Sequence, residues 1–287
     1  MVIDIHAHPV LFDVINPDDE TLSFRKKQLG VYKSGRVPLD FALRLMDDAG
    51  IDKTLILGED YSADSLRPLV SNDEIKTVLD AAPGRFIGFA GADPRKEDAK
   101  DELERAFSKL GLSGLYLNLS RLRMFPDDER LLPLMKLCED SGKPVIFNAG
   151  YSWMPDTPAK YSEPVRFEDI ACAFPRLRIC LSHLGWPWHM QTVMMLMKYP
   201  NVYTDTSLVY MGTPTAWYSQ IFTKEMDIGW LQNSFADKVM FGSDLPRWRQ
   251  VRAMKGLRDL PIRKDVLERL LGRNAEEFLG WRERDDR

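Results

Sequence analysis

The sequence predicts an α/β protein built as a distorted (β/α)8 TIM barrel, in a single domain that spans residues 1–287. Short apolar runs alternate with longer amphipathic segments from one end of the chain to the other, and there are eight such runs. Continuously apolar strands separated by helices are typical of parallel strands that are buried on both faces. Eight strand–helix units are the number that closes a barrel. No internal repeat and no linker divides the chain.

The individual elements follow from these two patterns. The strands are expected, in chain order, at residues 2–8, 53–60, 85–93, 113–120, 144–150, 177–183, 201–207 and 238–244. Apolar residues that recur three and four positions apart predict helices between them at residues 39–50, 74–84, 96–111 and 128–143. A doubly wound sheet is the alternative architecture. It is disfavoured because the turn after the first strand, HAHPVLFD, contains no glycine.

Residues 9–38 form the longest stretch without a clear period, and they mix proline, aspartate and basic residues. Loops longer than about 15 residues are usually functional or disordered. This segment is therefore a candidate lid over the mouth of the barrel.

Composition narrows the class of partner. The formal net charge of -4 offers no general attraction for nucleic acid or anionic lipid, so a small-molecule substrate is expected. No run of about 18 apolar residues and no signal-peptide pattern occurs, which favours a cytoplasmic protein without a membrane span. Three cysteines without CxxC spacing, Cys138, Cys172 and Cys180, are interpreted as buried thiols of a reducing compartment.

Residues that bind metals or transfer protons stand at the ends of the expected strands. These are His6 and His8, Asn148, His183 and Asp244. Active sites of this architecture lie at the carboxyl ends of the strands, so we expect these residues to converge on one rim. His6 and His8 are two positions apart and therefore point to the same face of a strand. Two imidazoles on one face suit a divalent ion such as zinc. A pair of hydrogen-bonded core histidines is disfavoured because each ring would need its own partner.

The other strand-end residues each have a chemical and a structural interpretation. Asp244 is a candidate metal ligand or general base, and its alternative role is a cap or turn carboxylate. His183 is a candidate for polarising a substrate carbonyl or protonating a leaving group, and its alternative role is structural. His189, at the expected start of a helix, is interpreted as a surface or capping residue.

Aromatic residues follow the later strands. Five tryptophans, together with Tyr151, Tyr210 and Phe12, are expected in rim loops, where they would line a pocket for a flat, apolar substrate. Their alternative role is loop packing. The tryptophans are Trp153, Trp186, Trp188, Trp217 and Trp248.

Arginines follow two of the strands, Arg121 and Arg123 after the fourth and Arg247 and Arg249 after the eighth. A planar guanidinium binds a carboxylate through two hydrogen bonds, so one of them is expected to hold an acidic substrate. Arg247 is the first choice because it is nearest Asp244. A solvated arginine is the alternative for each.

Four segments, taken in order, resemble a known family. DIHAHP, SHLGWPW, FGSDLP and LLGRNAEEFLG are similar to motifs of the amidohydrolase superfamily, and within it to the amidohydrolase-2 group of metal-dependent hydrolases and non-oxidative decarboxylases. The resemblance implies a distorted barrel, with His6 and His8 as metal ligands. It also implies Asp244 as ligand or base and His183 as a catalytic imidazole.

The chain departs from this family at two strands. Asn148 stands where the family usually has a histidine ligand, so a metal would be bound weakly or not at all. Tyr116 and Asn118 occupy the strand on which binuclear members carry a bridging lysine, which implies a single metal ion, zinc or manganese. A phosphatase of the PHP type needs more histidines than the four that this chain contains.

The leading hypothesis is a metal-dependent hydrolase of a small cyclic ester, lactone or amide. His6, His8 and Asp244 would hold the metal, Asp244 would accept a proton from water, and His183 would stabilise the developing oxyanion. If no metal binds, Asp244 would activate water unaided. Substrate contacts are expected from Asn148, Tyr116, Trp153, Trp186 and Arg247.

Two other hypotheses stay open. The first is a non-oxidative decarboxylase of an aromatic or dienoic acid, in which Asp244 or His183 would protonate the carbon. The second is a degenerate barrel that binds a ligand without turnover, which the substitution at Asn148 motivates. Aromatic rim loops also make a homodimer plausible.

Overall fold

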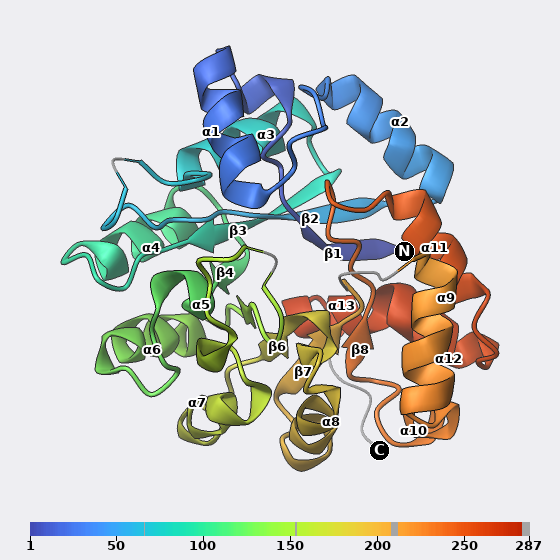
Figure 1. The fold of residues 1–287 in the computed structure, drawn as a ribbon. Coiled ribbons are helices and arrows are strands. Elements are labelled where there is room, and N and C mark those ends of the chain that lie inside the picture. The colour runs from blue at the N-terminus through green and yellow to red at the C-terminus, as the bar shows by residue number, and fades with distance from the viewer. Residues whose placement is uncertain (66, 153, 208–211, 283–287) are drawn as a thin grey trace.

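All eight expected strands form a single parallel sheet in chain order, as Figure 1 shows. The computed structural model describes residues 1–65, 67–152, 154–207 and 212–282. Each strand lies within its expected range. Apart from His6 in β1 and Asp205 in β7, the site's polar residues follow the strands and belong to the rim segments. The strands are β1 (Ile3–Ala7), β2 (Lys53–Leu57), β3 (Phe86–Gly91), β4 (Gly114–Leu117), β5 (Val145–Phe147), β6 (Ile179–Leu181), β7 (Val202–Asp205) and β8 (Val239–Met240).

The barrel closes between its first and last strands through residues that follow β8. The backbone N–H of Ile5 donates to the carbonyl of Phe241 at 2.9 Å, and the N–H of Asp244 donates to the carbonyl of His6 at 2.9 Å. A parallel bridge joins Ala7 to Leu245. The distortion predicted for the barrel is thus located here, and these bonds bring Asp244 beside β1.

Helices surround the strands in Figure 1. The four expected helices correspond to α2, α3, α4 and α6. The helices are α1 (Asp19–Leu29), α2 (Leu39–Ala49), α3 (Asn72–Ala81), α4 (Ala99–Ser108), α5 (Leu119–Leu122), α6 (Leu132–Asp140), α7 (Glu168–Ala173), α8 (His189–Lys198), α9 (Pro214–Ser219), α10 (Ile228–Asn233), α11 (Gln250–Arg258), α12 (Lys264–Glu268) and α13 (Asn274–Leu279). Short 3₁₀ turns lie at Asp13–Ile15, Glu129–Leu131, Ala159–Tyr161, Pro164–Phe167 and Ser182–Gly185, and π turns at Gln220–Glu225 and Arg269–Arg273.

Residues 9–38 are not irregular throughout, because they contain α1. The side chain of Asp18 caps this helix by accepting the N–H of Thr21 at 2.7 Å. The buried face of α1 consists of Thr21, Arg25 and Leu29, of which only leucine is apolar. Arg25 is buried because its guanidinium binds backbone carbonyls and the carboxylate of Glu74, at 2.6 Å. A helix that buries polar residues shows no apolar period, which is why the pattern did not predict it.

The last helix fills the barrel from the end at which the strands begin. The ring of Phe278 in α13 lies 6.4 Å from that of Phe89 and 5.4 Å from that of Tyr203, measured between centroids. Ile3, at the start of β1, belongs to the same apolar cluster. In Figure 1, α13 crosses the middle of the ring of strands. A packed apolar layer therefore separates the end of the barrel at which the strands begin from the polar residues at the opposite rim.

The cysteines differ from the expectation at one position. Cys138 and Cys180 are buried, but Cys172 is exposed because α7 places it on its outer face. Within the described ranges, no helix has both the length and the apolar character needed to cross a bilayer.

Candidate active site

The structure brings the five strand-end residues together at one rim. His6 lies in β1 and His8 directly after it, and Asn148 directly follows β5. His183 and Asp244 follow β6 and β8, and all five side chains are buried. The ring centroid of His6 lies 5.3 Å from that of His8 and 4.8 Å from that of His183.

Two carboxylates anchor the histidines of β1. Nδ1 of His6 lies 3.1 Å from Oδ2 of Asp205, and Nδ1 of His8 lies 2.7 Å from Oε1 of Glu59. Metal-binding histidines almost always donate one ring N–H to a carboxylate, carbonyl or water, which leaves the other nitrogen free for the metal. Here Nε2 is the free nitrogen of both rings.

The free ring nitrogens fit a divalent cation. Nε2 of His6 is buried and has no hydrogen-bond partner among the described residues. Nε2 of His8 lies 3.5 Å from Oδ1 of Asp244. The donor atoms of these three residues all lie within 4.8 Å of one another. Two imidazoles and a carboxylate are a donor set suited to a divalent transition-metal ion.

A second group of possible ligands, His6, His183 and Asp205, overlaps the first. The carboxylate of Asp205 is already occupied. It accepts the backbone N–H of His183 at 3.0 Å and that of Ser207 at 2.9 Å, as well as the Ser207 hydroxyl and Nδ1 of His6. Asp205 therefore acts as an anchor for the rim.

The anchoring carboxylates are ionised. Burial opposes the charge of Asp205, but the attraction of His6 and hydrogen bonds from His6 and Ser207 outweigh it and lower the pKa to about 2. Burial likewise opposes the charge of Glu59, and the attraction of His8 lowers the pKa of Glu59 to about 2. The imidazoles of His6 and His8 are thus each paired with a negatively charged carboxylate.

Asp244 is held as an anion on a strained backbone. Burial opposes its charge, but the guanidinium of Arg247, 3.0 Å from Oδ1, and the nearby ring of His8 keep the pKa of Asp244 well below its ordinary value. The φ angle of Asp244 is 59° and that of His183 is 61°. Left-handed backbone at residues other than glycine costs roughly 1–3 kcal/mol and clusters at functional sites.

His183 is a neutral imidazole. Its Nδ1 faces the carbonyl oxygen of Ser207 and lies 2.9 Å from the hydroxyl of Ser207, while its Nε2 lies 3.2 Å from Oδ1 of Asn148. Burial and the neighbouring His6 lower the pKa of His183 to about 4.

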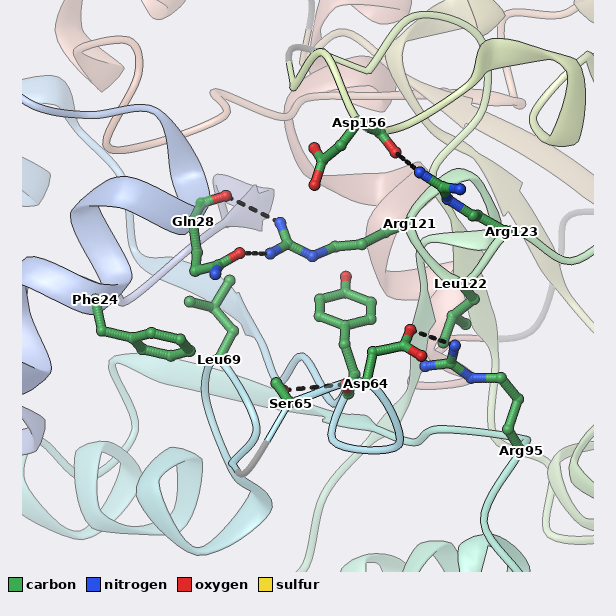
Figure 2. A pocket seen from close by; sticks show the side chains of 11 residues that line it. Phe24, Gln28, Asp64, Ser65, Leu69, Arg95, Arg121, Leu122, Arg123 and Asp156 are labelled. Atoms are coloured by element: carbon green, nitrogen blue, oxygen red, sulfur yellow. Dashed lines mark hydrogen bonds and ion pairs between the residues drawn. The ribbon is translucent and has the colours of Figure 1, made fainter.

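One cavity adjoins these residues, and a second cavity shares Arg121 with it. The inner one has a volume of about 30 Å³, little more than one water. It is lined by His8, Leu29, Glu59, Tyr116, Asn118, Arg121, Asn148, Tyr151, Ser152, Met154, His183, Asp244 and Arg247. The outer one, shown in Figure 2, has a volume of about 440 Å³. Leu29, the last residue of α1, lines the inner cavity, so the segment 9–38 reaches the rim.

Arg121 lines both cavities. Its guanidinium donates to the backbone carbonyl of Gln28 at 2.9 Å and to the side-chain oxygen of Gln28, and Figure 2 shows the two side chains meeting across the outer cavity. The guanidinium also lies over the ring of Tyr61, 4.7 Å from its centroid. Within the described ranges Arg121 forms no salt bridge, and its side-chain hydrogen bonds go to the neutral oxygens of Gln28.

The remaining expected contacts are placed as follows. Tyr116 in β4 lines the inner cavity, with its ring centroid 6.0 Å from those of His6 and His8. Arg247 lines it too but is bound to Asp244. Trp186 is not among the residues that line the inner cavity. It packs against Tyr151 and Trp217 at centroid distances of 5.8 Å and 5.5 Å.

Other members of the expected aromatic wall lie elsewhere. Phe12 is buried and packs against Phe86 at 5.7 Å between centroids, and Tyr151 alone of the described members lines the inner cavity. Trp153 and Tyr210 lie outside the described residues. His189 begins α8, as expected, and lies 3.6 Å from Glu225.

The sequence patterns do not single out the residues that support the histidines, which are Glu59, Tyr61, Asp205 and Ser207. The hydroxyl of Tyr61 donates to Glu59 at 2.7 Å. A signal for the two acids was present, because Glu59 follows β2 and Asp205 ends β7. Acidic residues at the carboxyl ends of apolar strands are candidates for the same rim as the histidines.

Comparisons with known proteins agree with this fold. A 2-amino-3-carboxymuconate-6-semialdehyde decarboxylase from Dictyostelium discoideum is 26% identical over 239 residues, a match that covers 73% of this chain and 65% of that protein. An uncharacterized TIM-barrel protein from Bordetella bronchiseptica is 25% identical, with a TM-score of 0.74 over 97% of this chain and 98% of its own.

A dihydroxybenzoic acid decarboxylase from Polaromonas sp., solved with bound manganese and the inhibitor 2-nitroresorcinol, shares the fold. It is 18% identical, with a TM-score of 0.67, and the match covers 97% of this chain and 96% of that one. The family model of the amidohydrolases matches residues 3–281, nearly the whole chain. This protein therefore belongs to the amidohydrolase family.

Proposed function

We propose that this protein is a metal-dependent, non-oxidative decarboxylase of a small aromatic or dienoic acid. The observation that carries the proposal is the group formed by His6, His8 and Asp244, with the first two anchored through Nδ1 and their Nε2 atoms free. The relatives named above favour decarboxylation, the alternative in the sequence analysis, over hydrolysis of an ester, lactone or amide.

His6, His8 and Asp244 would hold one divalent ion, manganese or zinc. When bound, such an ion supplies a positive charge that attracts the substrate carboxylate and a neighbouring oxygen and favours the charge developing as the carbon–carbon bond breaks. Glu59 and Asp205 keep both imidazoles oriented for that ion.

Asp244 is the residue placed to move the proton. For an acid with a hydroxyl beside the carboxylate, Asp244 takes the hydroxyl proton and gives it to the carbon that bears the carboxylate. The bond to the carboxylate then breaks, carbon dioxide leaves, and the electron pair returns to the ring. The product regains its hydroxyl proton from solvent, so one proton is consumed. Arg247, 3.0 Å away, holds Asp244 in place for both transfers.

Arg121 is the residue that we assign to an acidic group of the substrate. Arg247 was the first choice from the sequence, but it is already paired with Asp244. Arg121 is bound to the neutral oxygens of Gln28, and a carboxylate replaces such partners readily because it forms stronger, charge-assisted bonds. The inner cavity, at about 30 Å³, is too small to admit an aromatic substrate. Arg121 therefore moves aside when substrate enters, and the two cavities join.

The test is release of carbon dioxide by manganese-loaded protein from a panel of hydroxybenzoates and carboxylated dienoic acids. The Asp244→Asn variant is the control, because it keeps the shape of the side chain and removes the proton carrier. Hydrolysis of lactones without release of carbon dioxide would establish the hydrolase instead. Tight binding of these acids, with equal and negligible turnover in both proteins, would point to a barrel without chemistry.

A further inference from the structure

Asn148 stands at the end of β5 and contacts His183 in a way that leaves a hydrogen-bond conflict. Nδ1 of His183 faces two acceptors, the carbonyl oxygen and the hydroxyl oxygen of Ser207, and that hydroxyl gives its own proton to Asp205. Nδ1 must therefore carry the ring proton. In a neutral imidazole Nε2 is then an acceptor. Yet the atom 3.2 Å from Nε2 is Oδ1 of Asn148, which is also an acceptor.

The other atom of the same amide has the opposite problem. Nδ2 of Asn148 is buried and has no hydrogen-bond partner among the described residues, although buried N–H groups are nearly always paired. A half-turn about the Cβ–Cγ bond exchanges the two amide atoms without changing the volume of the side chain. Nδ2 then donates to Nε2 of His183, and the orphaned position is taken by an oxygen.

We propose that Asn148 is a positioning residue that donates Nδ2–H to Nε2 of His183 and turns its Oδ1 into the inner cavity. There the oxygen accepts the hydroxyl of a hydroxy acid when the acid first binds, before that proton passes to Asp244. The hydrogen bond to His183 stands by itself, and the assignment of a substrate hydroxyl rests on the proposed function.

The chemistry of the amide supports this assignment. An amide oxygen accepts hydrogen bonds and does not donate them, so it pairs with a hydroxyl and repels a carboxylate oxygen. Asn148 lines the inner cavity together with Asp244, the proposed proton carrier. Within the described ranges, no acceptor pairs with the amide atom that now occupies the orphaned position. A ligand hydroxyl is the group that completes it.

The tautomer is tested by ¹⁵N-detected NMR of the histidine rings, which is tractable because the chain contains four histidines. We expect His183 to carry one proton, on Nδ1, at neutral pH. In Asn148→Asp the carboxylate accepts from Nε2, so a second ring proton appears while the shape of the side chain is kept. A protonated Nε2 in the native protein would overturn the first half of the proposal. His183→Gln assigns the signal.

The role of Oδ1 of Asn148 is tested by measuring the binding of manganese and of two acids. Asn148→Ala is expected to bind manganese with a Kd within about twofold of the native value, whereas His8→Ala loses it by tenfold or more. An equal loss in Asn148→Ala would make Oδ1 a metal ligand and overturn the hydroxyl assignment. Circular dichroism checks that both variants are folded.

Manganese-loaded native protein is expected to bind 2-hydroxybenzoate more tightly than benzoate, and Asn148→Ala to lose about three- to tenfold of that preference. A preference that survives unchanged overturns the hydroxyl assignment. If the native protein binds neither acid, the proposed substrate class fails together with the hydroxyl assignment, and the NMR result distinguishes that failure from failure of the hydrogen bond to His183.

Discussion

Nδ1 of His8 lies 2.7 Å from the carboxylate of Glu59, and both groups are buried. This contact decides which way the ring faces, because it leaves Nε2 as the atom directed towards Asp244. The same carboxylate accepts the hydroxyl of Tyr61, whose ring lies beneath the guanidinium of Arg121. Glu59 therefore connects His8, a proposed metal ligand, through Tyr61 to Arg121. Arg121 and its partner Gln28 form the wall between the two cavities.

Replacing Glu59 with glutamine is expected to weaken manganese binding by about 10–100-fold, because the amide lowers the basicity of His8 and no longer fixes its orientation. Isothermal titration calorimetry measures the change. Glu104→Gln, on the exposed face of α4, is the matched control and should bind manganese as the native protein does. Equal affinities in the two variants would show that Glu59 does not support the site.

Metal content tests the histidines directly. Protein purified without chelator should contain about one divalent ion per chain, and the double variant His6→Ala, His8→Ala should contain none, because two of the three donors are gone. Mass spectrometry of the metal identifies manganese or zinc. His189→Ala removes a histidine that begins α8 outside this site and should keep the metal. Retention of metal by the double variant would place the ion elsewhere.

Much of this arrangement was predictable because apolar runs and strand ends are local features. The pair His6 and His8 follows from spacing alone, since a strand alternates its faces. Glu59 and Asp205 stand at strand ends, which makes them candidates for the rim, but only the fold shows that each carboxylate pairs with a histidine.

Other features depend on contacts that no local pattern reports. α1 was missed because it buries Thr21 and Arg25 where an amphipathic helix has apolar residues. The wall between the cavities joins Arg121 to Gln28, which are 93 positions apart. Neither residue type is unusual in its own segment, so their meeting is a property of the folded chain.

The contact between Arg121 and Gln28 predicts how substrate enters. Arg121→Ala is expected to raise KM for an acidic substrate by about 10–100-fold with a smaller change in kcat, because a charge-assisted contact worth roughly 1.5–3 kcal/mol is lost. Gln28→Ala should lower KM, since it frees the guanidinium from one competing oxygen. Steady-state kinetics of carbon dioxide release give both values.

Arg123→Ala is the matched control for the outer cavity, because among the described residues the guanidinium of Arg123 makes only a long hydrogen bond of 3.4 Å, to the carbonyl of Asp156. Its KM should stay within about twofold of the native value, as expected for an exposed, weakly bound cation. If Arg123→Ala and Arg121→Ala raise KM equally, the effect is one of overall charge and not of a specific clamp.

Acid stability depends on Asp93, a buried residue that lies two positions after β3. Burial opposes its charge, but the guanidinium of Arg95, at 2.7 Å and 2.8 Å, and the N–H of Ala63 lower its pKa below the ordinary value of 3.8. The unfolded chain therefore binds the proton more tightly than the folded one. The stability that Asp93 contributes is present above pH ~4 and is lost as the pH falls through the folded pKa.

Asp93→Asn is accordingly expected to lower the free energy of unfolding by roughly 2 kcal/mol at pH 7, because charge-assisted hydrogen bonds are lost, and by much less near pH 3, where the native carboxyl is itself becoming protonated. Urea unfolding at the two pH values measures the difference. Asp101→Asn, exposed on α4, should change stability little at either pH. A loss in Asp93→Asn that is equally large at both values would mean that the side chain stabilises the fold by its shape and its neutral hydrogen bonds, with no contribution from its charge.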